Sequence, residues 1–277
     1  IRLRNSDQSL TETFSFEVID DQLFTPLLVY TGALNTVLSW AREVGAATYE
    51  VESTTRFQDQ PSVTTRNLFT GQSAGISAAL STAVPVSALL SNPFEKVSVQ
   101  GVDVDIASSE SARTSTITRA WLTENTPESG DTVELNVELQ TPDRGTTIES
   151  IEIDLPNHLS GPVQLAIMDS QTLMQRDSQN GLGIDSARSV AQLLQELNET
   201  SQNDHIYIEL RTSTPSAVLR GNELELLPPS VLSVLNADTE SGNILTLSQT
   251  TLGKWSLATD AVVSGSRLLS VAIEVNE

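Results

Sequence analysis

The first part of the chain alternates between strand-like and helix-like patterns of apolar and polar positions. Residues 11–19 alternate along their length and predict a strand whose apolar residues share one face. The Asp20-Asp21 pair that follows is typical of a turn or a helix cap. Residues 22–41 then hold twenty uncharged positions with leucines at helical spacing. They predict a helix.

A second uncharged stretch covers residues 67–94. Its alanine-rich part, Gly75 to Leu90, predicts another helix, broken or kinked at Pro85. Because neither stretch carries a charge, we expect both helices to be buried. Polar residues such as Asn35 punctuate the first of them, which favours a helix packed within the protein over a transmembrane span.

Strand patterns flank these helices. Residues 47–54 and 62–65 predict a hairpin, because turn-forming residues separate two runs rich in Thr and Val. Residues 94–106 alternate valines on either side of Gly101, which predicts a strand with a bulge.

Beyond a polar join at residues 108–111, the pattern changes to short strands separated by turn residues. Such spacing is typical of a β-sandwich. The predicted strands are residues 114–122, 132–139, 148–153, 163–168, 206–210, 244–248, 255–257 and 268–275. Leucines at helical spacing after Asp185-Ser186 predict one helix among them.

The fold class expected from these patterns is α+β and mainly β. Residues 1–107 are predicted to form an α+β domain with two buried helices. Residues 108–277 are predicted to form an Ig-like β-sandwich with a helical insertion near residues 186–200. The length of 277 residues suits two such domains.

Composition narrows the range of partners. The chain has 36 acidic and 15 basic residues and a net charge of −21, so it lacks the basic face that nucleic acid requires. It has two lysines, Lys96 and Lys254, and Ser, Thr, Asn and Gln fill surface positions instead, which suits a secreted or densely packed protein. We therefore expect an extracytoplasmic location. There is no cysteine, and the chain begins at Ile1 without a signal segment, so we expect a fragment of a longer precursor.

One string resembles a catalytic motif. Gly71-Gln72-Ser73-Ala74-Gly75 matches the G-x-S-x-G elbow of serine hydrolases. Ser73 would need a histidine, and the chain has only His158 and His205, both beyond the expected domain boundary. We therefore interpret Ser73 as structural.

Candidate ligands for calcium are equally weak. Asp103 and Asp105 lie on one face of a predicted strand and are more simply its solvated side. The acidic residues 124–131 form a predicted turn, and no EF-hand or H-E-x-x-H spacing occurs. The sequence predicts no catalytic residue, no cofactor and no metal site.

Five strings together resemble the C-terminal region of bacterial envelope proteins of the SpoIVB-type serine peptidase family, along essentially the whole chain. They are residues 13–21 (TFSFEVIDD), 91–95 (SNPFE), 129–133 (SGDTV), 227–235 (LPPSVLSVL) and 263–267 (VSGSR). The family's Gly-Met-Ser-Gly-Ser-Pro and Gly-His motifs do not occur here, so the resemblance carries over no catalytic residue. It implies that a peptidase part lies upstream.

The function expected from the sequence is that of a non-catalytic module that binds itself or an envelope partner, without an integral membrane span. The alternatives are an accessory region that controls an upstream SpoIVB-like peptidase, and a free-standing serine hydrolase that uses Ser73. Self-association is suggested by the abrupt N-terminal strand around Leu3, by the scarcity of lysine that guards sheet edges, and by the two uncharged stretches.

Overall fold

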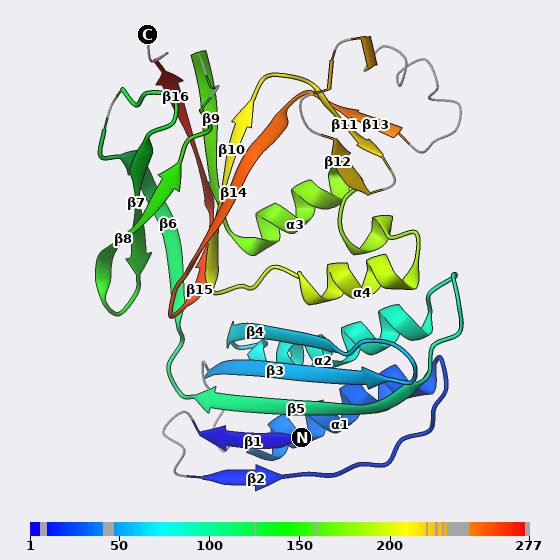
Figure 1. Cartoon of the computed structure of the whole chain (residues 1–277). Helices are drawn as coiled ribbons and strands as arrows, with labels where there is room; N and C mark the ends of the chain where they lie inside the picture. The colour runs from blue at the N-terminus through cyan, green and yellow to red at the C-terminus, as the bar shows by residue number, and fades with distance from the viewer. Residues whose placement is uncertain are drawn as a thin grey trace. The chain divides into compact units, whose positions relative to one another are not determined.

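The computed structural model describes residues 1–5, 10–40, 47–124, 126–157, 159, 161–219, 221–224, 227–228, 230–231 and 244–274. The fold is mainly β with helices, as expected, and the chain forms two compact units (Figure 1). Unit 1 contains residues 1–113 and 187–203, and unit 2 contains residues 114–186 and 204–277. The helix expected as an insertion into the second domain thus groups with the first unit.

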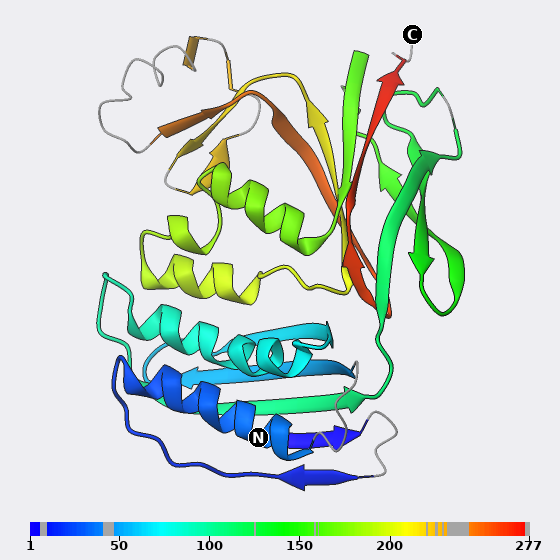
Figure 2. The same ribbon diagram turned by 180° about the vertical axis from the view of Figure 1, so that it is seen from behind.

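Unit 1 is a five-stranded sheet in the order β2-β1-β5-β3-β4, in which β1 and β5 are parallel and the other pairs antiparallel. Helices α1 and α2 cover one face of the sheet (Figure 2), and α4 contacts β4. The elements are β1 (Arg2–Asn5), β2 (Thr11–Thr13), α1 (Phe24–Trp40), β3 (Ala47–Phe57), β4 (Val63–Gly71), α2 (Ala74–Leu90), β5 (Val99–Ser109) and α4 (Val190–Asn198).

Small residues let the two helices of unit 1 approach each other closely. A Cβ atom on Gly75 of α2 would lie 2.9 Å from Cγ1 of Val37 on α1, which a real side chain could not accept without a shift. Beneath this contact, the helices and the sheet share one apolar core. Its fully buried members include Leu3 of β1, Ala78 of α2 and Ile106 of β5.

The opposite face of this sheet is polar. Arg66 of β4 bonds Glu50 of β3 at 2.9 Å, and Arg2 and Arg56 pair with Asp105 and Asp103 of β5. These ion pairs are part-exposed, so they contribute little stability. They mark this face as the solvated side of the sheet.

The structure corrects the first predicted strand and confirms its neighbours. Strand β2 stops at Thr13, because its partner β1 supplies register only from Arg2 to Arg4. Asp21 caps α1 by accepting the backbone N–H groups of Leu23 and Phe24 at 2.9 Å. These bonds, led by that from Phe24, lower the pKa of the carboxyl.

The predicted hairpin is β3 and β4, paired antiparallel. The predicted bulge is present as a register shift between β3 and β5, where Arg56 pairs with Gly101 and the next residue, Phe57, pairs with Val99. Helix α2 continues through Pro85 instead of breaking there.

The prediction that both helices are buried is wrong for one side of each. On α1, Leu27 and Leu38 are more than half exposed, and Leu80 of α2 is 53% exposed. The buried positions of α1 are mostly small or polar, such as Ala33 and Thr36. The helices therefore place mostly small residues against the core and leave several large apolar residues outside.

Unit 2 contains two four-stranded sheets, in the orders β15-β6-β7-β8 and β14-β10-β9-β16, and a three-stranded sheet β12-β11-β13. The predicted strands of this unit are all present, whereas α3, β11, β12 and β15 were not predicted. Its elements are β6 (Thr114–Leu122), β7 (Thr132–Thr141), β8 (Gly145–Asp154), β9 (Gly161–Met168), α3 (Ser170–Gln179), a short 3-10 turn (Ile184–Ser186), β10 (His205–Thr212), β11 (Ser216–Leu219), β12 (Asn222–Leu224), β13 (Ile244–Leu247), β14 (Thr250–Ala258), β15 (Val262–Ser264) and β16 (Ser266–Ile273).

The two four-stranded sheets of unit 2 bury one common apolar core. Leu135 and Ile153 from one sheet and Ile167 and Ile208 from the other are fully buried in it. Strands β6, β7 and β8 share one sheet, whereas in an immunoglobulin domain the third strand belongs to the other sheet. The strand order of unit 2 therefore differs from that of an immunoglobulin domain.

Candidate functional site

Ser73 lies where a nucleophile elbow would place it, after β4 and at the N-cap of α2. Its side chain is exposed and makes no capping hydrogen bond. Its φ of −96° is ordinary, so the strained geometry of an elbow is not present. Both histidines belong to unit 2 by their sequence positions, while Ser73 belongs to unit 1.

His205 begins β10 and has a partner of its own. Its Nδ1 lies 2.8 Å from Oδ1 of Asp204, and its ring stacks with Tyr207 at a centroid distance of 6.1 Å. His205 is partly exposed at the end of its strand. His158 lies outside the described residues.

The acidic candidates are held by neighbouring groups. Asp103 and Asp105 pair with arginines, as described above, and the loop residue Asp131 accepts the backbone N–H of Glu128 at 2.8 Å. Among the described residues, no three His, Asp or Glu side chains gather as a metal site would need.

A cluster of buried charges in unit 2 went unpredicted. Helix α3 packs on β10, on the face of the sheet opposite the apolar core. Its N-cap residue is Asp169, whose Oδ1 accepts the N–H of Thr172 at 2.7 Å. The other oxygen of this buried carboxylate accepts the N–H of Gly265 at 2.6 Å. One carboxylate thus caps α3 and ties it to the turn between β15 and β16.

Glu209 of β10 is the centre of the cluster and is 2% exposed. Arg176 of α3 donates to its two oxygens from Nη1 at 2.5 Å and Nη2 at 2.6 Å. Arg211, two residues further along β10, donates to it from Nε at 3.0 Å and Nη2 at 2.8 Å. A bidentate pair and a second arginine fix both guanidinium groups in orientation.

Asp177 supplies a second counter-charge to Arg176. Burial raises the pKa of Asp177, and the neighbouring Arg176 offsets only part of this rise. Within the described residues, the buried Nε of Arg176 has no hydrogen-bond partner. The two arginines are therefore anchored mainly by a single carboxylate.

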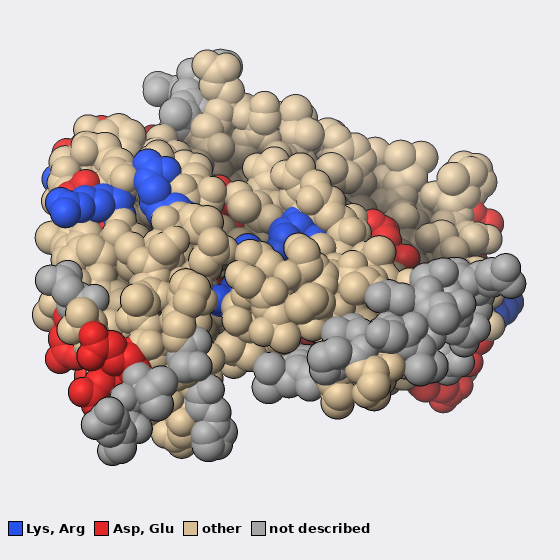
Figure 3. Space-filling view, turned by 90° about the horizontal axis from the view of Figure 1, so that it is seen from above, with Lys and Arg blue, Asp and Glu red and all other residues tan. Residues whose placement is uncertain are grey.

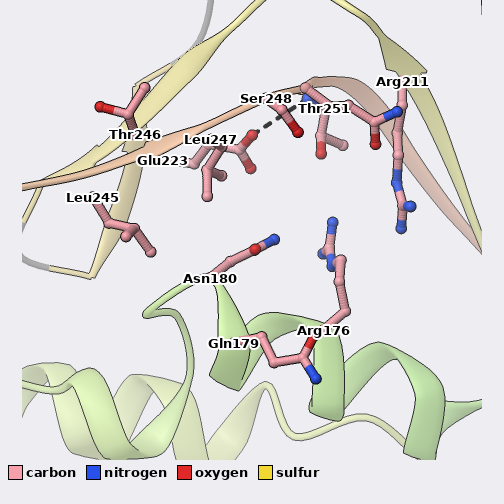
Figure 4. Close-up of a pocket in the computed structure, with 11 residues that line it drawn as sticks. Arg176, Gln179, Asn180, Arg211, Glu223, Leu245, Thr246, Leu247, Ser248 and Thr251 are labelled. Carbon is pink, nitrogen blue, oxygen red and sulfur yellow. Dashed lines mark hydrogen bonds between the residues drawn. The ribbon is translucent and has the colours of Figure 1, made fainter.

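These arginines reach into a pocket of about 400 Å³. Figure 4 shows Arg176 entering from α3 and Arg211 from β10, with Glu223 of β12 on the opposite wall. Oε1 of Glu223 accepts the N–H of Thr251 at 3.3 Å. The remaining lining residues are Gln179, Asn180, Leu245, Thr246, Leu247, Ser248 and Gln249.

A smaller pocket of about 290 Å³ lies in the same unit, where Arg144 pairs with Asp260 at 2.5 Å. Both side chains are about two-thirds exposed, at 64% and 65%. Such a pair is well hydrated and is not held in place as the Glu209 cluster is.

The second candidate is the outer side of α1 and α2 in unit 1, which we call the helical face. Its residues are apolar and exposed, and they are Phe24, Leu27, Leu28 and Leu38 on α1 and Ile76, Leu80 and Val84 on α2. Neither helix contains a charged residue. The helices are in contact, so the two apolar rows are neighbours.

Figure 3 shows one side of the molecule on which Lys, Arg, Asp and Glu form small groups among mostly uncharged residues. In the described part of the chain, no helix has the length and apolar character needed to cross a membrane.

The comparisons with protein-family models, with curated proteins and with solved structures found no match to this chain.

Proposed function

We propose that this chain is a non-catalytic, extracytoplasmic association module that joins copies of itself through the helical face. The observation that carries the proposal is the inversion of polarity in unit 1. The outer face of its sheet is polar, whereas the outer face of its helical layer exposes leucine, isoleucine and phenylalanine. Large exposed apolar surfaces of this kind are typical of interfaces.

Charge favours a second copy as the occupant. A chain with a net charge of −21 repels another copy over most of its surface. The helical face carries no charge, so two copies meet there with the least repulsion and the most apolar burial. Half-exposed side chains such as Leu80 each contribute on the order of 1 kcal/mol when they become covered.

The structure modifies the route by which self-association was expected. Strand β1 pairs with β2 on one side and with β5 on the other, so its backbone is not an open edge. At the other end of the sheet, Asn198 of α4 accepts the N–H of Thr64 on β4 at 3.0 Å. The helices, more than the N-terminal strand, supply the surface for association.

For unit 2 we propose an Ig-like architecture. Two layers of mostly antiparallel strands with a shared core form the stable scaffold of many cell-surface binding domains, whose strand order varies. Extracytoplasmic placement accords with the surface rich in Ser, Thr, Asn and Gln.

Light scattering coupled to size-exclusion chromatography tests the proposal. The wild-type chain is expected to shift from monomer to a larger mass as its concentration rises through the micromolar range. Leu80→Glu places a charge on the helical face and should hold the chain at monomer mass. Leu268→Glu is the matched control, because Leu268 is 59% exposed on β16 of unit 2.

A wild-type mass that stays monomeric at every concentration would overturn the proposal. Equal effects of the two substitutions would also contradict it, since the helical face would then have no special part. Co-sedimentation of the wild-type chain with lipid vesicles, without self-association, would assign the face to a membrane surface instead.

A further inference from the structure

We propose that the pocket between α3, β10 and the β12-β11-β13 sheet binds the α-carboxylate of an amino acid or a short peptide. Arg176 and Arg211 would hold the carboxylate, and Glu223 would accept hydrogen bonds from the ligand's amino group. This inference concerns unit 2 and is independent of self-association through the helical face.

The arginines are arranged as a site for a planar anion. Both guanidinium groups bond the buried Glu209 behind them, and Figure 4 shows their side chains converging on the pocket from two elements. They keep 17% and 16% of their side-chain surface exposed. Guanidinium groups match carboxylates in geometry, and groups already fixed in place lose little conformational entropy on binding.

The guanidinium groups on this wall are opposed by two carboxylates, Glu209 and Asp177. The arginines would therefore hold a ligand by hydrogen bonds in a fixed orientation, and not through an excess of positive charge.

The rest of the lining indicates a zwitterionic ligand and not a simple anion. Glu223 on the far wall would repel a phosphate or a dicarboxylate, but it would attract an ammonium group. The side-chain amides of Asn180 and Gln249 can bond a peptide group, and Leu247 offers an apolar contact. A volume of about 400 Å³ lies within the usual range for small-ligand sites.

Titration of the ¹⁵N-labelled full chain with alanyl-leucine, followed by backbone amide shifts, tests the proposal. Shifts are expected to saturate in the millimolar range and to concentrate at residues 179–180 and 246–251. Alanyl-leucine amide, which lacks the carboxylate, should bind at least tenfold more weakly. Acetyl-alanyl-leucine, which lacks the free amino group, should bind several-fold more weakly than alanyl-leucine. Titration with free leucine distinguishes an amino-acid site from a peptide site.

Substitutions assign the groups. Arg211→Gln leaves Arg176 on Glu209 and is expected to weaken alanyl-leucine at least tenfold, while Arg144→Gln, at the other pocket, should change nothing. Glu223→Gln should weaken alanyl-leucine but not acetyl-alanyl-leucine. Circular dichroism confirms that each variant is folded, and the ligand comparisons on the wild-type chain hold even if one variant is not.

Three results would overturn the proposal. The first is the absence of shifts at about 10 mM alanyl-leucine, which places any affinity below the range of a specific site. The second is equal binding of the acid and the amide, which would exclude recognition of the carboxylate. The third is an equal loss in the Arg144→Gln control.

Discussion

Glu209→Gln should destabilise unit 2 strongly, although it changes little in shape. Glu209 is 2% exposed and accepts four N–H bonds from Arg176 and Arg211, at 2.5, 2.6, 2.8 and 3.0 Å. Glutamine carries no charge, and its NH₂ group would face donors instead of accepting from them. Removing one partner of a buried ion pair costs about 3–5 kcal/mol.

Two features reduce this figure. The side chains of Arg176 and Arg211 are 17% and 16% exposed, so water can hydrate them in part once the carboxylate is lost. Asp177 also stays beside Arg176 as a counter-charge. We therefore expect Glu209→Gln to lower the free energy of unfolding by about 2–4 kcal/mol.

Urea denaturation provides the measurement. Trp121 and Trp255 belong to unit 2, so in a Trp40→Phe background the tryptophan fluorescence reports on this unit. Because the chain has two units, circular dichroism is also recorded, and it shows whether unit 1 unfolds in a separate transition. Glu152→Gln on the exposed side of β8 is the matched control and should change stability by less than about 0.5 kcal/mol.

A loss below about 1 kcal/mol for Glu209→Gln would refute the reasoning, because a carboxylate so enclosed cannot then be the anchor of both arginines. A loss equal to that of Glu152→Gln would refute it as well.

Three further predictions concern single positions. Gly265→Ala should cost about 1–3 kcal/mol in urea denaturation, because Gly265 has φ +92° and any Cβ there would be strained. Burial raises the pKa of Asp177, so the wild-type chain loses stability as pH rises through that pKa. Asp177→Asn should therefore gain stability relative to the wild type as pH rises above 3.8, the ordinary pKa of the carboxyl, and a gap independent of pH would contradict this. Ser73→Ala should leave thermal stability unchanged, and a fluorophosphonate probe should not label the wild-type chain at Ser73, as labelling would show an activated nucleophile.

Periodic apolar segments were predictable because one face of each must be buried. The hairpin of β3 and β4, the helix α2 and the strand Thr114–Leu122 follow from that rule, the last with its predicted ends. Helix α3 was missed, since the sequence from Ser170 to Gln179 holds only Leu173 and Met174 as apolar residues. Its position depends on tertiary contacts, which Asp169 makes with Gly265 and Arg176 makes with Glu209.

The pocket was not predictable for a related reason. Glu209 alternates with Ile208 and Leu210 along β10, a pattern that indicates a solvated strand face. The sequence does not show that α3 covers this face, because Arg176 lies 33 residues before Glu209. Burial of both helices was predicted from missing charges, which do not distinguish a core from an interface. The prediction therefore failed for Leu27 and Leu80, which are exposed.

The presence of the Glu209 cluster is not in itself evidence that the cluster stabilises the fold. Buried ion pairs can often be replaced by apolar side chains of similar volume without loss, because desolvation offsets their attraction. The joint substitution Arg176→Met, Glu209→Leu and Arg211→Met should therefore keep unit 2 folded, although Glu209→Gln alone damages it. What the apolar variant cannot supply is two guanidinium groups fixed at the wall of a pocket. If it folds like the wild type and no longer binds alanyl-leucine, the cluster serves the pocket and not the fold.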